Sequence, residues 1–521
     1  MLVSRLTADP ATRVLLLEAG GKDRNPWIHI PAGFYRNIYH PKITWQFETE
    51  PQAELGGRRL PWPRGKVLGG SSSINGLIYI RGQKQDFDLW RQLGNTGWSY
   101  DDVLPYLRRA ENQERSADAH HGAGGPLDVT DLRARHELHD AFMAAEEAGY
   151  RRNDDFNGAE QDGVGPLQLT VRNKRRCSAA VAYLRPALKR ANLRVEIRAL
   201  AHRSCWKTAA RSGWSIHGKK LCTGYGRGAR YCSPAARSIR RNCCSSPESG
   251  RGNCCAPRAL PSCTICRAWG ENLQDHINAR VVHHVRRPNT LNEISRSWMR
   301  QARAGLEYVL TRRGTLMMGA APIGLFARTR PGLVSPDVQY QFLAGSFVTP
   351  GGKMHDFPAC QATCIPCRPE SRGWLRIRSP DPAAPPAIQP NYLATQADKD
   401  TLIAGLRIAF RIFQTRAMQE YVDEEFLPGP ATESVEEWLA HIAKTAGTTY
   451  HPTCMMGTHE RAVVDPALRV HGVEGLRMID ASIMPAVVSG NTNAATIMIA
   501  EKGADMVLAT ARAAPAVKAA A

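Results

Sequence analysis

A histidine and an asparagine near the C-terminus have the residue types needed to remove a proton from a hydroxyl group. His451 lies in a Tyr-His-Pro sequence, and Asn493 closes the later sequence Gly-Asn-Thr-Asn. An imidazole can act as the base, while a carboxamide holds the oxygen from which the proton leaves. The pair therefore predicts the oxidation of an alcohol.

The segment between these residues predicts the elements that position them. Residues 475–480 have the pattern of an apolar strand ending at Asp480, a Pro-containing connection follows, and an amphipathic helix is expected to open near Asn491. A strand and helix joined in this way can place His451 and Asn493 side by side.

Four further stretches follow one another in a characteristic order: VLLLEAG at 14–20, PRGKVLGGSSSINGLIYIRG at 63–82, RPESRGWLRIRSPDP at 368–382 and NYL at 391–393. Together with the His and Asn arrangement, the chain resembles the glucose-methanol-choline (GMC) flavoprotein oxidoreductases. The resemblance covers residues 1 to about 200 and about 269 to 510.

The resemblance implies an FAD cofactor and a set of residues that hold it. Glu18 would accept hydrogen bonds from the adenosine ribose. The glycine-serine loop, residues 69–73, would let the backbone approach the cofactor closely. The start of the last helix would favour the negative charge of the reduced flavin. The cofactor-binding residues expected in this way are Glu18, Val67, Gly69, Gly70, Ser71, Asn75, Gly76, Asp480, Ala481, Asn491 and Thr492.

Each of these residues also has a plainer interpretation. Glu18 could be an ordinary acidic strand end, the glycine-serine loop a simple turn, and Asp480 a strand-end cap. Asn491 could be a helix N-cap. A lone histidine is more often structural than catalytic, and His276, in GENLQDH, is the main rival to His451.

The position of Glu18 bears on the N-terminal end of the expected dinucleotide-binding unit. In such a unit the acidic residue follows the Gly-rich fingerprint by about 20 residues. The first strand and its GxGxxG turn are therefore expected to precede Met1, and residues 4–10 have the pattern of the end of the first helix.

Residues 201–268 differ from the rest of the chain. They contain thirteen Lys and Arg against one acidic residue, Glu248, and nine of the fourteen cysteines. Adjacent cysteine pairs suit a zinc site poorly, and a disulfide scaffold requires an oxidising compartment. A third hypothesis is a shifted reading frame that begins near Ala201 and recovers before Gly270.

The net charge of +20 does not favour a nucleic-acid-binding protein, although this class remains a remote alternative. The 201–268 segment carries +12 of that charge, which leaves a modest +8 for the remaining residues. No apolar run approaches the roughly 18 residues that span a bilayer, and no secretory signal is visible. We expect a cytoplasmic protein, with peripheral membrane association left open.

The expected fold class is α/β: a Rossmann-like FAD-binding domain with an inserted α+β substrate-binding domain. Residues 1–278 would form the first part of the FAD-binding domain, with an excursion into the substrate domain near 111–165. Residues 279–440 would form the substrate-binding domain, 441–510 would return to the FAD-binding domain, and 511–521 would be a tail. Strand 337–343 and helix 401–413 fit the substrate domain.

The expected substrate is a primary alcohol, oxidised to the aldehyde by hydride transfer to the flavin N5 with His451 as base. No carboxylate that would bind a quaternary ammonium lies in 314–330, whereas Met317, Met318, Ile323, Leu325 and Phe326 suggest an apolar wall, or simply core. The electron acceptor, quinone or oxygen, stays open. An inactive fragment of such an enzyme is the main alternative.

Overall fold

The computed structural model describes residues 1–134, 136–207, 210–216, 231–232, 269–286, 289–349, 351–379, 381, 383–429, 432–448 and 454–513. Residues 202–207, 210–216 and 231–232 are described as strands without side-chain detail. His451 lies outside the described residues. Most of residues 201–268 also lie outside them, and the hypotheses on the cysteines of that segment therefore concern residues that are not described.

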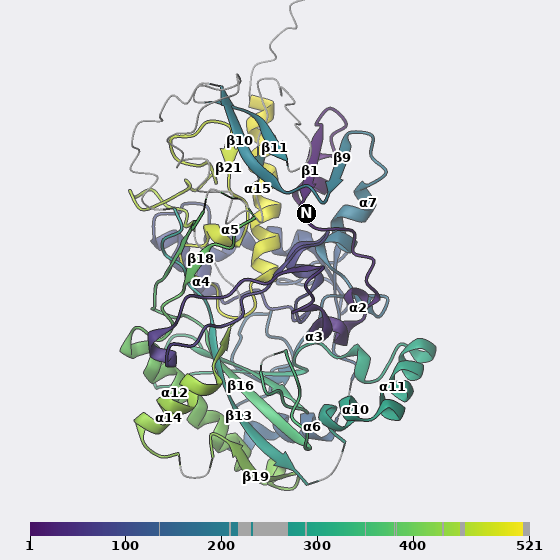
Figure 1. The fold of residues 1–521 in the computed structure, drawn as a ribbon, viewed down its shortest axis with the longest axis vertical. Coiled ribbons are helices and arrows are strands. Elements are labelled where there is room, and N and C mark those ends of the chain that lie inside the picture. Colours follow the sequence, from purple (N-terminus) through teal and green to yellow (C-terminus); the bar gives the residue numbers. More distant parts are fainter. Residues whose placement is uncertain are drawn as a thin grey trace, which may run out of the picture.

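The largest sheet has seven antiparallel strands in the lower half of Figure 1. Its order is β19-β13-β16-β15-β14-β6, and the short β20 pairs with the beginning of β13. The strands are β6 (Gly163–Pro166), β13 (Ile277–Val285), β14 (Ile323–Ala327), β15 (Val338–Leu343), β16 (Ala359–Pro366), β19 (Val422–Leu427) and β20 (Gly447–Thr448).

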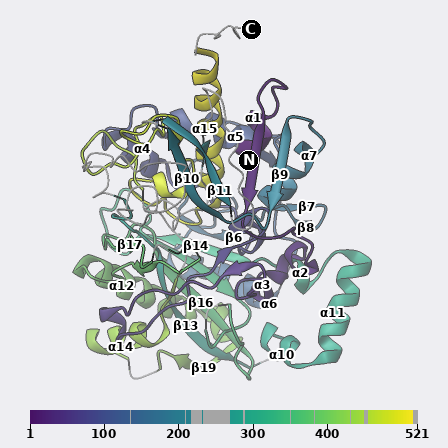
Figure 2. The ribbon, with the colours of Figure 1, turned by 45° about the horizontal axis from the view of Figure 1, so that its top comes forward.

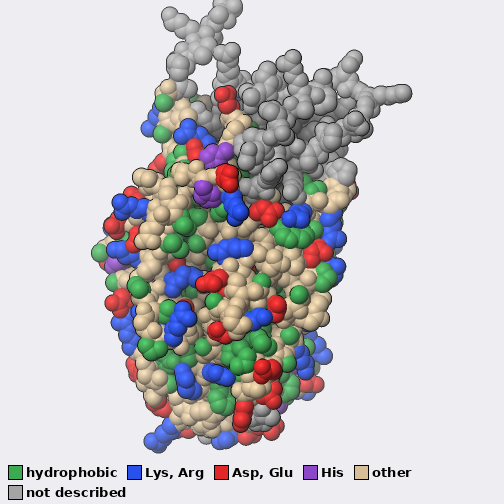
Figure 3. Space-filling view, turned by 90° about the vertical axis from the view of Figure 1, so that its left-hand side faces the viewer, with side chains coloured by type: hydrophobic (Ala, Val, Ile, Leu, Met, Phe, Trp, Pro, Cys, Tyr) green, Lys and Arg blue, Asp and Glu red, His purple; other side chains and the backbone are tan. Residues whose placement is uncertain are grey.

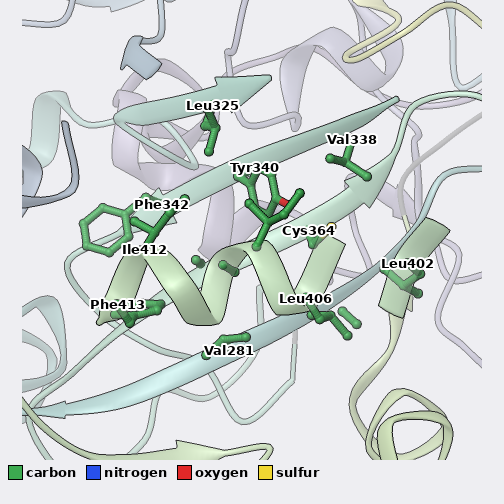
Figure 4. Packing of buried hydrophobic residues seen from close by; sticks show 14 of the residues in the cluster. Val281, Leu325, Val338, Tyr340, Phe342, Cys364, Leu402, Leu406, Ile412 and Phe413 are labelled. Carbon is green, nitrogen blue, oxygen red and sulfur yellow. The ribbon is translucent and has the colours of Figure 1, made fainter. Parts of the chain in front are cut away.

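One face of this sheet is covered by helices and forms the main core. The alternation of a strand sends Val338, Tyr340 and Phe342 of β15 to the covered face. There they pack against α12 (Gln396–Phe413), whose Leu402, Leu406 and Phe413 point toward the sheet (Figure 4). Helices α6 (Glu137–Met143) and α14 (Val435–Thr445) complete the cover. On the opposite face, β13, β15 and β16 carry several polar side chains, among them Arg280, Gln339 and Gln361.

The upper half contains the strands and helices expected of a dinucleotide-binding unit. β1 (Val14–Glu18) pairs in parallel with β9 (Leu193–Ile197), and α1 (Leu2–Leu6) precedes β1. The long α15 (Asn493–Ala513) packs on α5 (Tyr100–Ala110) and α1, and Figures 1 and 2 show it beside β1 and β9.

Two further pairs of strands lie near this unit. β21 (Leu476–Arg477) pairs in parallel with β12 (Tyr231–Cys232), and β10 (Ala201–Lys207) and β11 (Ala210–Ile216) form an antiparallel pair.

The other described elements are shorter or lie at the surface. The remaining strands are β2 (Thr44–Trp45), β3 (Arg64–Gly65), β4 (Glu111–Gln113), β5 (Leu127–Val129), β7 (Val171–Arg172), β8 (Arg175–Arg176), β17 (Trp374–Arg376) and β18 (Ala387–Gln389). The remaining α-helices are α2 (Pro26–His29), α3 (Phe34–Asn37), α4 (Lys84–Gln92), α7 (Arg185–Ala187), α10 (Leu291–Arg296), α11 (Trp298–Thr311) and α13 (Arg416–Gln419). The other helical turns are η1 (Pro31–Gly33), η2 (Ala53–Leu55), η3 (Gly70–Ser73), η4 (Ala144–Ala148), η5 (Ala180–Leu184), η6 (Thr315–Met317) and η7 (Ala481–Ile483).

The α/β fold class predicted from the sequence is confirmed. The expected strand at 337–343 is β15, and the expected helix at 401–413 is the C-terminal part of α12, which begins at Gln396 because Thr395 caps it. Among the described helices, none is both long and apolar enough to cross a bilayer. On the face shown in Figure 3, basic and acidic side chains are interspersed.

Candidate active site

A cavity of about 1130 Å³ lies between the upper unit and the polar face of the large sheet. The upper unit contributes Glu18, the loop of residues 62–72 and the first turn of α15. Ligand pockets commonly measure roughly 300–1,000 Å³, so the cavity is large enough for a sizeable cofactor and a small substrate.

The structure brings almost all of the predicted site residues that it describes to this one cavity. The lining includes Glu18, Gly69, Gly70, Ser71, Asn75, Gly76, Asp480, Ala481, Asn491, Thr492 and Asn493. Val67 does not line it. Its side chain is fully buried against Ile28, Ile43 and Ile74, and its backbone forms a parallel bridge with Gly21. Val67 therefore anchors the glycine-serine loop to the turn after β1.

The glycine-serine loop owes its shape to two residues in the left-handed region. Gly69 has φ +92° and Gly70 has φ +55°, a conformation that side-chain-bearing residues seldom adopt. A Cβ on Gly70 would meet no neighbour within 4 Å, because it would point into open space at the cavity edge. The Ser72 hydroxyl donates to the Gly69 carbonyl at 2.7 Å and stabilises the turn. The loop thus presents backbone to whatever fills the cavity.

Arg176, which was not predicted from the sequence, fixes this loop through hydrogen bonds. Its guanidinium is almost fully buried and donates to Asn75 Oδ1 at 2.6 Å and to the carbonyls of Ile28 and Ser72. Burial lowers the pKa of Arg176 to about 9. No local pattern around Arg176 distinguishes it from surface arginines, so only the tertiary structure assigns it this position.

Glu18 ends β1 with its carboxylate partly buried at the cavity. Its Oε1 accepts a hydrogen bond from the Gly20 N–H at 2.7 Å. Burial raises the pKa of this carboxyl to about 7, although the Gly20 N–H and the charge of Lys66 oppose the rise. A ligand that donates hydroxyl hydrogen bonds to the carboxylate would favour its charged form.

The raised pKa predicts a pH-dependent effect of replacing Glu18. In the cofactor-free protein, the contribution of Glu18 to stability falls as pH rises from about 4.5 to about 7, because the carboxyl releases its proton in the unfolded chain first. We expect Glu18→Gln to raise the free energy of unfolding by about 1–3 kcal/mol at about pH 8 and to leave it unchanged at about pH 4. Denaturant unfolding of the apoprotein at both pH values measures this effect, and an equal change at both would contradict it.

The residues before α15 connect the two halves of the site. Asn491 Oδ1 accepts a hydrogen bond from Gln339 Nε2 of β15 at 3.2 Å, so its carboxamide bonds to the sheet. The helix begins at Asn493, two residues later, and the Thr492 carbonyl accepts from Thr496 within its first turn. Asp480 caps η7 by accepting a hydrogen bond from the Ser482 N–H at 2.8 Å, and it also lines the cavity. Its position is therefore compatible both with a cap and with a place beside the cofactor.

His276, the alternative to His451, lies in the cavity wall with its imidazole fully buried. Its ring Nε2–H donates to the Cys367 carbonyl at 2.8 Å. Burial lowers the pKa of His276 to about 4, and the hydrogen bond to Cys367 only partly offsets this. A neutral, donor-committed imidazole suits a structural role.

The expectation that residues between 317 and 326 form an apolar wall of the cavity is wrong. None of Met317, Met318, Ile323, Leu325 and Phe326 lines the cavity, since all five are buried in hydrophobic clusters. β14 turns Ile323 and Leu325 to the face covered by helices, because alternate residues of a strand point to opposite sides. The alternative that these residues are core is the correct one.

The cavity wall on the sheet side is mainly polar instead. Six polar side chains line it from alternate positions of three strands: Asn278 and Arg280 of β13, Gln339 and Gln341 of β15, and Gln361 and Thr363 of β16. Leu343 of β15 and Ile365 of β16 lie at the ends of these rows. The period-two polarity of residues 276–280 is visible in the sequence, but which face would be covered by helices is not. Arg280 was missed for that reason.

Fold and site together define an α/β flavoenzyme, and comparison with known proteins identifies its family. Family models for the N-terminal and C-terminal parts of GMC oxidoreductases match residues 19–221 and 369–500. The chain belongs to the GMC oxidoreductase family.

Several relatives match over nearly the full length. The chain is 39% identical to the mitochondrial choline dehydrogenase of Homo sapiens, over 97% of this chain and 87% of the relative. It is 35% identical to an alcohol dehydrogenase (acceptor) of Pseudomonas putida, over 98% and 93%. Among solved structures, pyridoxine 4-oxidase from Mesorbium loti aligns with a TM-score of 0.83 and 26% identity, over 97% and 96%.

The cofactor of this family is FAD, and the cavity fits it. A carboxylate ends β1 as the ribose requires, left-handed glycines expose the loop backbone, and the N-terminal turn of α15 opens on the same space. The protein is therefore an FAD-dependent oxidoreductase acting on CH–OH groups.

Proposed function

We propose that this enzyme oxidises a primary alcohol to the aldehyde, with His451 as the base and Asn493 orienting the substrate oxygen. The observation that carries the proposal is the cavity itself. It is lined both by the residues expected to hold FAD and by the polar side chains of the sheet, and Asn493 also lines it.

The chain's own groups divide the work between binding and proton removal. The glycine-serine loop and Glu18 bind the cofactor, and the polar sheet face receives the substrate. Asn493 holds the alcohol oxygen while His451 removes its proton, which raises the tendency of the carbinol carbon to release hydride. FAD, when bound, would supply the hydride acceptor, its N5. The carbon thus loses one hydride, which carries two electrons, and the oxygen loses one proton.

The electron acceptor that reoxidises the enzyme is not defined by these residues. The relatives include both oxygen-dependent and acceptor-dependent enzymes by name. Oxygen uptake measured against reduction of a soluble quinone, with one alcohol as donor, separates the two classes.

Deuterium at the carbinol carbon tests the proposed reaction. We expect the dideuterated alcohol to slow the reductive half-reaction several-fold relative to the protiated alcohol. The same label placed on a neighbouring carbon should have almost no effect. Equal rates for all three substrates at a chemistry-limited step would overturn hydride transfer from that carbon.

A further inference from the structure

The polar wall of the cavity carries a positive charge without a negative partner among the residues that the structure describes. Arg280 is 3% exposed, and its Nη2 donates to the carbonyls of Val348 at 3.0 Å and Thr445 at 3.5 Å. Its Nε is buried without a hydrogen-bond partner among the described residues. A buried guanidinium donor left unpaired costs about 1–3 kcal/mol or more, so the position of Arg280 lowers the stability of the fold.

A second arginine lines the same cavity. The Arg58 guanidinium donates to the carbonyls of Ala443 and Ala446, and neither it nor Arg280 forms an ion pair with a described acidic side chain. Burial, reinforced by the positive charge of Arg58, lowers the pKa of Arg280 to about 10, which leaves it charged near neutral pH. Two neighbouring cations therefore face the cavity from its sheet side.

The acidic residues of the cavity lie elsewhere. Within the described lining these are Glu18, at the ribose end, and Asp480, which caps η7. The substrate wall instead offers the carboxamides of Gln339, Gln341 and Gln361. A quaternary ammonium group would thus meet arginine side chains, whereas an anion would meet the guanidinium of Arg280, whose charge is not paired with a described carboxylate.

We propose that the substrate is a primary alcohol that carries a carboxylate, and that Arg280 binds that carboxylate. This inference rests on the proposed alcohol oxidation and specifies its substrate class. Arginine suits the role because its planar donors match the two oxygens of a carboxylate. Arg280 is then the specificity-determining residue of the cavity, and Arg58 supports it through its charge.

The test compares three alcohols of similar size with the FAD-loaded enzyme: 4-(hydroxymethyl)benzoate, benzyl alcohol and choline. We expect kcat/KM to be at least about 10-fold higher for the carboxylate than for the neutral alcohol, and lowest for choline. Arg280→Met should lower kcat/KM for the carboxylate by about 100-fold and change benzyl alcohol oxidation little. Arg280→Lys should retain part of the preference. Arg286→Met, just past the end of the same strand, is the matched control.

Binding without turnover supplies an independent measurement. Terephthalate, a carboxylate without a carbinol group, should perturb the bound-flavin spectrum of the wild type and bind at least about 10-fold more weakly to Arg280→Met. If Arg280→Met does not fold, the wild-type preference among the three alcohols decides. Equal or greater activity on choline would overturn the inference, whereas no reaction with any alcohol would overturn the proposed function instead.

A different observation carries a second inference: α11 exposes a continuous apolar face. Trp298, Met299, Leu306, Val309 and Leu310 are 77%, 63%, 60%, 63% and 72% exposed. Their spacing places them on one side of the helix, while Ala304 and Tyr308 form the buried side. Figures 1 and 2 both show α11 projecting from the body of the molecule.

Basic residues flank this apolar face. α10, α11 and the two residues after α11 contain five arginines against two glutamates. The arginines are Arg296, Arg300, Arg303, Arg312 and Arg313. An amphipathic helix with this composition is typical of segments that lie in the interface of an anionic membrane. In a symmetric contact between two copies, the like charges would face one another, so self-association through this face is disfavoured.

We propose that α11 binds the surface of an anionic phospholipid bilayer, with Trp298, Leu306 and Leu310 inserted among the lipids. From α11 the chain continues through η6 to Ala320, which lines the active-site cavity. Membrane binding would therefore hold the cavity region close to lipid.

Co-sedimentation with vesicles tests this inference. The wild type should bind vesicles of phosphatidylcholine mixed with phosphatidylglycerol, bind pure phosphatidylcholine more weakly, and lose affinity as salt increases. The double variant Leu306→Ser, Leu310→Ser should bind at least about 10-fold more weakly, since two exposed apolar side chains are lost. Val334→Ser, which removes a 79% exposed apolar side chain elsewhere, is the control.

Two outcomes would overturn membrane binding by α11. One is failure of the wild type to bind the anionic vesicles. The other is a lipid-free dimer that the Leu306 and Leu310 substitutions convert to a monomer, which would make the face a contact between copies.

Discussion

Replacing His451 with Ala is expected to lower kcat by about 10²–10⁴-fold while FAD remains bound, because loss of a general base typically costs this much. The expectation rests on the sequence, since His451 lies outside the described residues. Asn493→Ala, which removes only the carboxamide at the start of α15, should have a smaller effect, because the proposed role of Asn493 is to orient the substrate oxygen. Rapid-mixing measurements of flavin reduction, with flavin content from the visible spectrum, check both.

The matched control is His459→Ala, an exposed histidine of the same segment. It should retain wild-type flavin reduction. Equal rates for His451→Ala and the wild type, at a pH where chemistry limits the rate, would remove His451 from the mechanism. His276 would then be the next histidine of the cavity to examine.

Gly20→Ala is expected to abolish stable FAD binding or folding, whereas Gly21→Ala should leave both unchanged. A Cβ on Gly20 would lie 1.8 Å from the Lys66 carbonyl oxygen, which is far closer than two non-bonded atoms can approach. Because the Gly20 N–H also bonds Glu18, the clash would displace the carboxylate and the glycine-serine loop together. We expect a loss of FAD affinity of at least about 100-fold, or about 3 kcal/mol.

Gly21 is a close control because it is the next residue along the chain. A Cβ there would meet nothing within 4 Å, and neither glycine has a positive φ. Any difference between the two alanine variants therefore reports the contact with Lys66 and not the change in backbone flexibility. FAD titration followed by fluorescence measures the effect, and equal affinities would show that the loops separate easily.

Much of the fold could be predicted because its central elements have strong local patterns. The run of apolar residues before Glu18 predicted a strand, which is found as β1. The pattern of α12 places its apolar residues on one face, which made it visible from 401–413. These segments are specified by periodicity that needs no knowledge of their partners.

The substrate side of the site could not be predicted in the same way. Met317, Ile323 and Leu325 were assigned to a cavity wall, yet they are buried in cores, because local sequence does not show which face of a strand its helices cover. Arg280 was missed for the same reason. The cofactor side was easier to predict, because glycines in a loop and an acidic residue at a strand end indicate their structural roles from the local sequence alone.

Anaerobic mixing of the FAD-loaded protein with primary alcohols is the most direct test of flavin-dependent alcohol oxidation. The oxidised-flavin absorbance should disappear, with one aldehyde formed for each flavin reduced, and most rapidly with a carboxylate-bearing alcohol. A protein that binds FAD stoichiometrically, is reduced by dithionite, and is not reduced by any neutral, cationic or anionic alcohol would contradict the proposed reaction.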